Sequence, residues 1–243
     1  MFLIRFLIVV IIKIFALTFY RIRIEYLSLE SKNVPWDKLN LVALLNHTSL
    51  YEPLFLGIVP FSLLYRFARY GLFPGAQETL DRPVVGFFFK LMAANAVAIS
   101  RKRDATWDDF LSHVNQHSLI FLTPEGRMRR PNGLDKFGKP MSVKGGIFDM
   151  LSILQQGKML IVYSRGLHHV QAPGQFFPKL FKEIKIGLEL VDIEKILELA
   201  KNCRLADSAS SLETHLTSHE YDKKFIMNLL DQKRDNFMQS IPL

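Results

Sequence analysis

The pattern of apolar and polar positions divides the chain into a long apolar start and a body of shorter, alternating segments. Residues 2–20 are almost entirely apolar and, as a helix, would reach roughly 28 Å, close to the thickness of a bilayer core. Residues 21–27 alternate apolar and polar side chains, which predicts a strand. Further strands are expected at residues 39–45, 96–100, 118–122, 159–163 and 184–191.

Helical segments are expected between and after these strands. They begin near Pro53 and cover residues 107–117, residues 143–156 and a C-terminal stretch that runs from a capping-box pattern at residues 217–220 to about Gln239. Strands separated by helices predict an α/β fold with a mixed, largely parallel sheet flanked by helices. We therefore expect an N-terminal membrane-associated helix (residues 1–20), one folded domain (21–200), and a C-terminal loop and helix (201–243), with the loop over 201–216.

Two charges interrupt the apolar start, and their positions bear on how it meets a membrane. On a helix, Arg5 and Lys13 lie about 80° apart and so share one side. A helix lying in the interface, with both charged heads reaching water, fits this pattern better than a clean span, although a tilted or re-entrant helix stays open. A cleaved signal peptide is the competing interpretation, but no small-x-small cleavage site follows the apolar run. Arg21 and Arg23 would then sit at the headgroups, so we expect the protein at the cytoplasmic face of the inner (plasma) membrane.

Composition adds partner classes to this picture. Of the 243 residues, 49% are hydrophobic and 20 are Phe, which indicates contact with lipid. The formal net charge of +8 fits anionic partners such as phosphates, anionic lipid or nucleic acid. No nucleic-acid recognition module is readable, so nucleic acid is not an expected partner. The single cysteine, Cys203, excludes an internal disulfide and fits a reduced, cytoplasm-facing domain.

The first candidate for chemistry is Asn-His-Thr-Ser-Leu-Tyr-Glu-Pro at residues 46–53, directly after the apolar strand. Loops at the carboxyl ends of parallel strands are where α/β folds place their sites. His47 can accept a proton from a hydroxyl, and Glu52 can hold the far ring nitrogen. On a continuous helix the two side chains would point about 140° apart, which places His47 in a turn. Alternatively, Ser49 and Glu52 form a capping box and Glu52 only fixes a helix start.

Three further stretches combine charge with turn residues. They are Ala-Ile-Ser-Arg-Lys-Arg at residues 98–103, Phe-Leu-Thr-Pro-Glu-Gly-Arg-Met-Arg-Arg at 121–130, and Ser-Val-Lys-Gly-Gly-Ile-Phe at 142–148. Arg101 and Arg103 at a strand end suit a phosphate, because a guanidinium grips it with two N–H groups. Glu125 lies in a turn beside several guanidiniums, and Lys144 opens a helix whose backbone donors suit an anion. Taken alone, each also fits an exposed basic turn or an ordinary helix entry.

In this order, the four stretches resemble the motif set of the glycerophospholipid acyltransferase superfamily, whose bacterial members include the 1-acyl-glycerol-3-phosphate acyltransferases. That family carries Asn-His followed by four residues and an Asp, a strand ending in Arg, Phe-Pro-Glu-Gly, a Lys-Gly helix start, and a strand with a Val-Pro pair. The resemblance covers about the first 190 residues. It implies that residues 21–200 form an acyltransferase domain.

The resemblance also implies the reaction and the roles of the residues. A membrane-bound O-acyltransferase would move a fatty acyl group from acyl-CoA or acyl carrier protein to a lysophospholipid hydroxyl, above all that of 1-acyl-glycerol-3-phosphate, giving phosphatidate. His47 would be the general base and Glu52 its orienting carboxylate, with no metal, redox cofactor or covalent enzyme intermediate. The implied substrate-binding residues are Arg101, Arg103, Glu125, Gly126, Arg127 and Lys144.

Three departures from the family pattern keep the acceptor open. Glu52 stands where the family usually has Asp, although the related lipid A late acyltransferases pair His with Glu at this spacing. Arg127-Met128 replaces Thr-Arg after Pro-Glu-Gly, and residues 161–163 lack the proline. Another lipid acceptor, such as a lyso-aminolipid or a lipid A precursor, remains an alternative. A non-catalytic peripheral membrane lipid-binding protein is the other.

Other patterns have simpler interpretations. Residues 133–139 nearly form a P-loop, but Pro140 stands where Ser or Thr is needed and no apolar strand leads in, so nucleotide hydrolysis is not expected. His113 and His117 have zinc-site spacing but no third ligand, which favours a solvated helix face. Residues 87–89 are three phenylalanines that fit either an acyl groove or the core.

Overall fold

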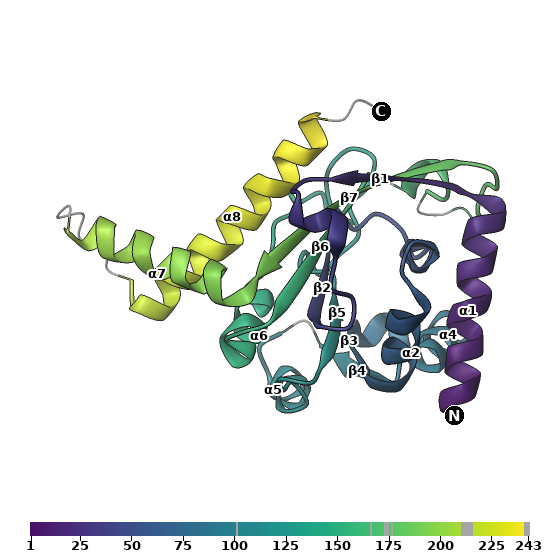
Figure 1. The fold of residues 1–243 in the computed structure, drawn as a ribbon, viewed down its shortest axis with the longest axis horizontal. Helices are drawn as coiled ribbons and strands as arrows, with labels where there is room; N and C mark the ends of the chain where they lie inside the picture. Colours follow the sequence, from purple (N-terminus) through teal and green to yellow (C-terminus); the bar gives the residue numbers. More distant parts are fainter. Residues whose placement is uncertain (101, 166, 173–174, 176, 210–215, 241–243) are drawn as a thin grey trace.

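A mixed seven-stranded sheet forms the centre of the protein in the computed structural model, which describes all residues except 101, 166, 173–174, 176, 210–215 and 241–243. Its strand order is β1-β7-β6-β2-β5-β3-β4 (Figure 1). Only the β6–β7 pair is antiparallel among the described strands. The strands are β1 (Arg21–Tyr26), β2 (Leu39–Leu45), β3 (Gly71–Ala76), β4 (Asn95–Ile99), β5 (Leu119–Leu122), β6 (Lys158–Ser164) and β7 (Glu183–Asp192).

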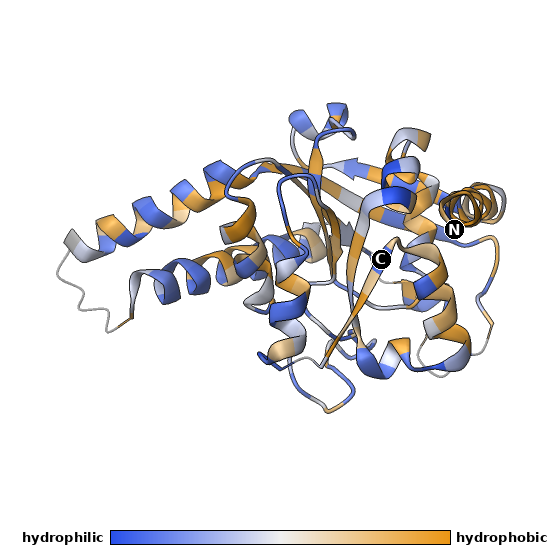
Figure 2. Ribbon diagram, turned by 90° about the horizontal axis from the view of Figure 1, so that it is seen from below, coloured by the Kyte–Doolittle hydropathy of each residue, from blue (hydrophilic) through white to orange (hydrophobic). Residues whose placement is uncertain are grey.

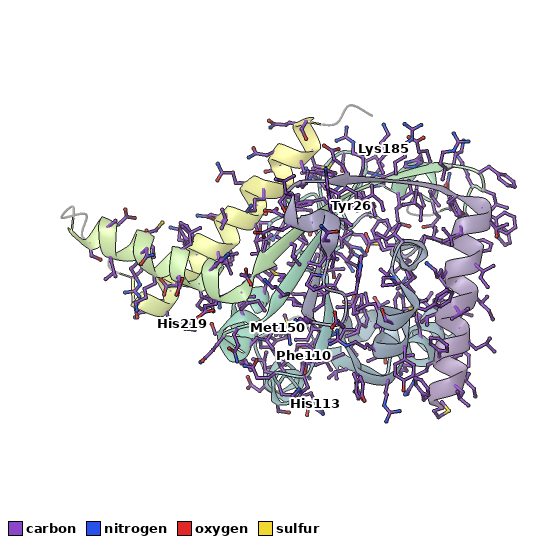
Figure 3. The ribbon with its side chains drawn as sticks, viewed as in Figure 1. Tyr26, Phe110, His113, Met150, Lys185 and His219 are labelled. Atoms are coloured by element: carbon purple, nitrogen blue, oxygen red, sulfur yellow. The ribbon has the colours of Figure 1, made fainter. Side chains whose placement is uncertain are left out.

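Helices cover both faces of this sheet. One face packs against α1 (Phe2–Phe19), η2 (Glu52–Gly57), α2 (Phe61–Tyr70) and α4 (Pro83–Met92). The other packs against α5 (Ala105–Ser112), α6 (Gly146–Leu154), α7 (Ile193–Ala209) and α8 (Ser218–Ser240). Phe110 and Met150 fill the space between α5, α6 and the sheet (Figure 3). Short helices are η1 (Glu30–Asn33), α3 (Gln77–Leu80) and η3 (Leu167–His169). The predicted α/β class is confirmed.

The central strand β2 shows why the site forms where it does. Leu41, Ala43 and Leu45 point into one core cluster and Val42 into the other, so β2 is buried on both faces, as its apolar run predicts. Strands β2, β3, β4, β5 and β6 all run in the same direction. The loops that leave their carboxyl ends therefore converge on one edge of the sheet.

The sequence patterns missed the segment that forms α2 and β3. Strand β3 reads Gly-Leu-Phe-Pro-Gly-Ala, and glycine and proline both argue against a strand. Proline is tolerated here because β3 pairs with β5 only through Gly71 and Leu72, while Pro74 lies in the ladder with β4. The helix expected near Pro53 is the short 3-10 helix η2.

The predicted loop over 201–216 is wrong for residues 201–209, because α7 continues to Ala209. The sequence there is polar, which suggested a loop. Its helix is held instead by the buried Ile193, Ile196 and Ala200 and by packing against α8. Residues 210–215 lie outside the described part of the chain. Helices α7 and α8 project together beyond the sheet (Figure 1).

Helix α1 lies along the domain, and one of its two charges turns inward. The Lys13 Nζ donates to the backbone carbonyls of Gly57 at 2.6 Å and Val59 at 2.9 Å. The expectation that both charged heads reach water is therefore wrong for Lys13, whose pKa is lowered by burial. The reason is that η2 packs on α1 and places the carbonyls of Gly57 and Val59 within reach of Lys13, a contact that the sequence pattern does not reveal.

The outer side of α1 is apolar. Among the described helices, α1 alone has the length and hydropathy needed to cross a membrane. It is largely exposed along the edge of the molecule (Figure 2). Its more than half-exposed side chains are Leu3, Ile4, Leu7, Ile11, Ile14 and Leu17.

Candidate active site

The site begins with a sharp turn at the end of β2. Asn46 has φ of 60°, a left-handed conformation that asparagine tolerates better than most residues. Its Nδ2 donates to the carbonyl of Ser164 at the end of β6 at 2.6 Å. The chain therefore leaves the sheet abruptly and His47 lies in the turn, outside both strand and helix, as the 140° argument predicted.

His47 and Glu52 form a close pair. The His47 Nδ1 lies 2.5 Å from Glu52 Oε2, and Glu52 Oε1 accepts from the backbone N–H of Thr48 at 3.0 Å. Glu52 does not make the capping-box bond to Ser49: its carboxylate contacts the two residues before Ser49, whose hydroxyl instead accepts from the Tyr51 N–H. A carboxylate on Nδ1 keeps the ring proton there, so Nε2 is the nitrogen with the lone pair.

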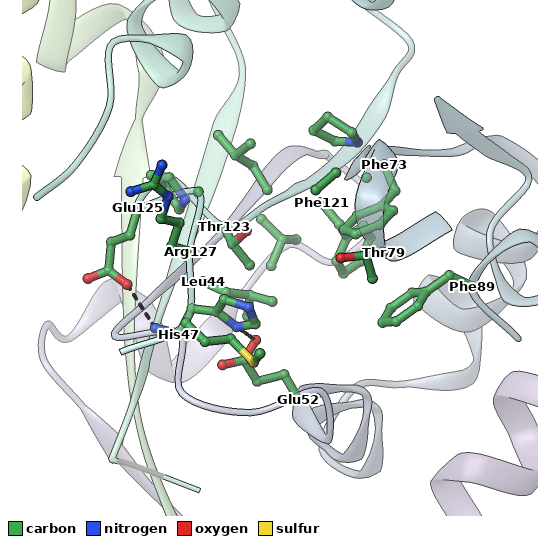
Figure 4. A pocket seen from close by; sticks show the side chains of 18 of the residues that line it. Leu44, His47, Glu52, Phe73, Thr79, Phe89, Phe121, Thr123, Glu125 and Arg127 are labelled. Carbon is green, nitrogen blue, oxygen red and sulfur yellow. Dashed lines mark hydrogen bonds and ion pairs between the residues drawn. The ribbon is translucent and has the colours of Figure 1, made fainter. Parts of the chain in front are cut away.

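The Pro-Glu-Gly turn lies directly against His47. The buried Glu125 accepts from the backbone N–H of His47 through Oε2 at 2.9 Å (Figure 4). The carbonyl of His47 accepts from the N–H of Arg129 at 2.6 Å. Gly126 has φ of 69° and closes the turn by donating to the Thr123 carbonyl, a conformation that favours glycine. The N–H and the carbonyl of His47 are thus both fixed by the stretch at 121–130.

A cavity of about 840 Å³ adjoins the pair, and its lining is mostly apolar. This volume is in the range of small-molecule sites. Its apolar lining comes from both sheet and helices: Val42, Leu44, Leu63, Phe67, Phe73, Phe89, Met92, Phe121, Leu160 and Val162. Of the three consecutive phenylalanines, Phe89 lines the cavity, whereas Phe87 is mostly exposed. An elongated apolar group can therefore be accommodated beside His47.

Three of the four predicted cations line the cavity, and two of these three are paired. Arg103 forms an ion pair with Asp149 and Arg127 lies 2.6 Å from Asp135, so part of each charge is neutralised. Lys144 lines the cavity from the approach to α6. The sixth predicted contact, Arg101, lies outside the described residues.

The segment after Pro-Glu-Gly brings in a lysine that sequence reasoning did not assign to the site. The backbone N–H of Lys139, together with Arg127 and the N–H of Phe137, outweighs burial and lowers the pKa of Asp135 to about 2. This carboxylate fixes the loop, which delivers Lys139 to the cavity. Lys102, Lys139 and Lys144 line it without a carboxylate partner among the described residues. The sequence signal was the stretch at 133–139, which nearly forms a P-loop. It does not fit nucleotide hydrolysis, but it carries the lysine that reaches the cavity.

A second residue was missed entirely. Arg234, on α8, donates to Glu125 Oε1 at 2.9 Å and is 4% exposed. Its sequence context is a polar helix with no motif, so nothing in the pattern pointed to the site. Within the described residues, no group of three or more His, Cys, Asp or Glu is placed to hold a metal ion.

A family match places this chain among the acyltransferases. Residues 25–162, more than half of the chain, match the family described as Acyltransferase, so the chain belongs to that family. Together with the fold, the match confirms membership of the glycerophospholipid acyltransferase superfamily.

A solved structure shares the architecture. The crystal structure of the 1-acyl-sn-glycerophosphate (LPA) acyltransferase PlsC from Thermotoga maritima matches with a TM-score of 0.52 and 19% identity, over 95% of this chain and 81% of that chain. At this identity, the likeness establishes the fold. No curated protein matches the chain significantly.

Proposed function

We propose that the protein transfers a fatty acyl group from an acyl thioester to the hydroxyl of a lysophospholipid. The observation that supports this most is the position of the His47–Glu52 pair within one cavity that is both apolar and cationic. His47 lies between Glu125 and Arg127 on one side and Phe73 and Phe89 on the other (Figure 4). An amphipathic lipid needs both kinds of lining, with its reacting group at the junction.

The proposed mechanism uses His47 as a general base. Its Nε2 takes the proton of the acceptor hydroxyl while the oxygen attacks the thioester carbonyl. The carbon–sulfur bond then breaks, and His47 returns the proton to the leaving thiolate. Glu52 keeps the proton on Nδ1 and stabilises the imidazolium that forms. The thioester is already activated, so this route requires no metal, redox cofactor or covalent enzyme intermediate.

The cavity suggests how substrates are recognised. Its apolar part suits a fatty acyl chain, and Lys102, Lys139 and Lys144 suit a phosphate, together with Arg101 as the family resemblance implies. The leading acceptor is 1-acyl-glycerol-3-phosphate, which would give phosphatidate, and a lyso-aminolipid or a lipid A precursor is the alternative. The donor is acyl-CoA or acyl carrier protein, because a basic surface suits either the phosphates of CoA or an acidic carrier.

Acyl transfer by the purified protein in detergent tests this proposal. Labelled acyl-CoA and acyl carrier protein are offered separately, each with lysophosphatidate, a lysophosphodiester lipid, a lyso-aminolipid and a lipid A precursor. We expect kcat/KM for lysophosphatidate to exceed that for the lysophosphodiester by roughly tenfold or more, since losing one charge-assisted contact costs about 1.5–3 kcal/mol. A different preferred lipid would select the alternative acceptor. Folded protein without turnover on any acceptor would favour the lipid-binding alternative.

We further propose that α1 holds the domain on the cytoplasmic face of the inner membrane by lying in the interface. Phe2 and Phe6 pack on Tyr65 of α2, Lys13 bonds to the residues around η2, and Phe19 packs on Phe181. These contacts extend along the whole helix, so a spanning position would require breaking them. The apolar side chains that remain exposed form a strip suited to the acyl boundary of a bilayer.

Vesicle binding tests the position of α1. Leu7→Glu and Ile11→Glu place charges on the exposed strip, and each is expected to weaken binding to phosphatidylglycerol–phosphatidylethanolamine vesicles by about tenfold, because each removes roughly 1.5 kcal/mol or more of apolar burial. Leu199→Glu and Leu205→Glu, on the exposed side of α7, are the matched controls and should bind as the unmodified protein does. Equal binding by all four variants in a co-sedimentation assay would exclude α1 as the docking element.

A further inference from the structure

Helix α8 lies outside the residues matched by the family, yet it reaches the proposed catalytic turn. Arg234 is buried and its guanidinium contacts three carboxylates: Glu125 at 2.9 Å, Asp231 at 2.7 Å and Asp235 at 2.9 Å. Burial opposes its charge, but the hydrogen bond to Asp235 and the charges of Glu125 and Asp231 outweigh this, so the pKa of Arg234 is raised. Arg234 is therefore a buried cation that contacts Glu125, the carboxylate bonded to the His47 N–H.

Glu125 connects this cation to the general base. One carboxylate oxygen accepts from Arg234, and the other accepts from the backbone N–H of His47, both at 2.9 Å. Glu125 is 1% exposed, and a buried carboxylate without a partner is unfavourable. Arg234 thus pairs with Glu125 and orients its carboxylate, and Glu125 fixes the peptide from which the His47 imidazole extends.

The same helix holds two neighbouring parts of the site. Asp231, one turn before Arg234, accepts from the backbone N–H of Val143 at 3.0 Å, just before Lys144. Met238, one turn after, accepts through its sulfur from the Asn46 amide at 3.2 Å. One face of α8 therefore contacts three segments that line the cavity, through Asn46, Glu125 and Val143.

We propose that α8 is a brace for the active site and that Arg234 is a positioning residue, acting through Glu125 to hold the general base His47 in register with the acceptor hydroxyl. The inference rests on the proposed function of the same site. Small displacements of a general base are costly, because proton transfer needs hydrogen-bond distance to the hydroxyl. In the proposed function the phosphate is bound by Lys102, Lys139 and Lys144, and not by Arg234, so loss of the brace is expected to affect turnover more than binding.

The decisive variant is Arg234→Met, which keeps an unbranched side chain about as long as the aliphatic stem of arginine but removes the guanidinium and its charge. Arg204→Met is the matched control, since Arg204 also forms an ion pair within the α7–α8 pair, with Asp222 at 2.8 Å, but does not contact the site. Steady-state kinetics are measured well below the melting temperature of each variant. Hydrogen exchange of residues 46–52, which include the His47 N–H, is measured on the same samples and does not depend on activity.

We expect Arg234→Met to lower kcat by roughly 10- to 100-fold, to change KM for the lysolipid by less than threefold, and to accelerate exchange in residues 46–52. Arg204→Met should leave all three quantities close to those of the unmodified protein. Arg234→Lys should recover part of the loss, because a lysine supplies the charge but grips fewer carboxylates. Glu125→Gln combined with Arg234→Met should also recover kcat, since a neutral amide can still accept from the His47 N–H.

The brace is refuted if Arg234→Met keeps kcat within threefold of Arg204→Met, or loses kcat without faster exchange in residues 46–52. If Arg234→Met does not fold, Arg234→Lys decides: the brace requires a 3- to 10-fold lower kcat together with faster exchange there, and the absence of either refutes it. Absence of turnover in both the unmodified protein and Arg204→Met would overturn the proposed function instead. The exchange measurement would still report on the brace.

Discussion

Replacing His47 with alanine is expected to lower kcat for acyl transfer by on the order of 10³-fold, within the range of 10²–10⁴ typical of a lost general base. In the described part of the chain, Glu52 bonds to the His47 ring and to the backbone N–H of Thr48, and of these groups the ring alone can take the hydroxyl proton. Residual activity should persist, because the cavity still brings thioester and hydroxyl together. The measurement is the kcat of the folded variant with the preferred lysolipid.

His113→Ala is the control for this variant. His113 lies at the end of α5, exposed and bonded to the Asp109 carbonyl, and does not line the cavity. Its kcat should equal that of the unmodified protein. Binding of His47→Ala to lysolipid micelles should be nearly unchanged, since His47 is one of many lining residues. A His47→Ala protein that turns over at more than a third of the unmodified rate would remove His47 from the chemistry.

The turn that holds His47 could be predicted because its determinants are local. An apolar strand, a histidine and a glutamate follow one another within fourteen residues, and the geometry of a helix excludes the alternative placement of His47. The role of Glu125 was predictable only as a motif. Its bond to the His47 N–H joins residues 78 positions apart, and no periodicity encodes such a contact.

The contribution of α8 was beyond sequence reasoning for a related physical reason. Arg234 and Glu125 are 109 positions apart, and a polar helix with scattered cations has several equivalent ways to rotate against a sheet. The rotation is fixed by the buried Ile226, Leu230 and Phe237, which place Arg234 inward. Lys13 is a parallel case, since the carbonyls that it binds become available only when η2 packs on α1.

The second large effect is expected from Glu52→Gln, which should lower kcat by roughly 10²–10⁴-fold without lowering stability. The amide oxygen can still accept from the Thr48 N–H, which turns the NH₂ group toward His47 Nδ1. The ring must then carry its proton on Nε2, where it cannot accept one from the hydroxyl. Asparagine in place of the aspartate of a serine protease triad has this effect, a loss of about 10⁴ in kcat.

The stability of Glu52→Gln separates this explanation from simple damage. Glu52 is buried, burial of an ionised carboxylate is costly, and Gln keeps the shape of the side chain and an oxygen for the Thr48 N–H. The melting temperature should therefore stay the same or rise while kcat falls. A kcat loss accompanied by a large fall in melting temperature would instead indicate that Glu52 mainly supports the turn.

The conservative change Glu52→Asp and a double substitution complete the argument. Aspartate keeps the charge, and the family usually carries it at this position, so Glu52→Asp should retain more activity than Glu52→Gln. Its activity should stay below that of the unmodified protein, because the side chain is one methylene shorter and the 2.5 Å contact to His47 lengthens. If His47 and Glu52 act as one unit, His47→Ala combined with Glu52→Gln should cost no more kcat than His47→Ala alone. Additive losses, or equal activity of the Asp and Gln variants, would mean that the carboxylate acts on the substrate rather than through the imidazole.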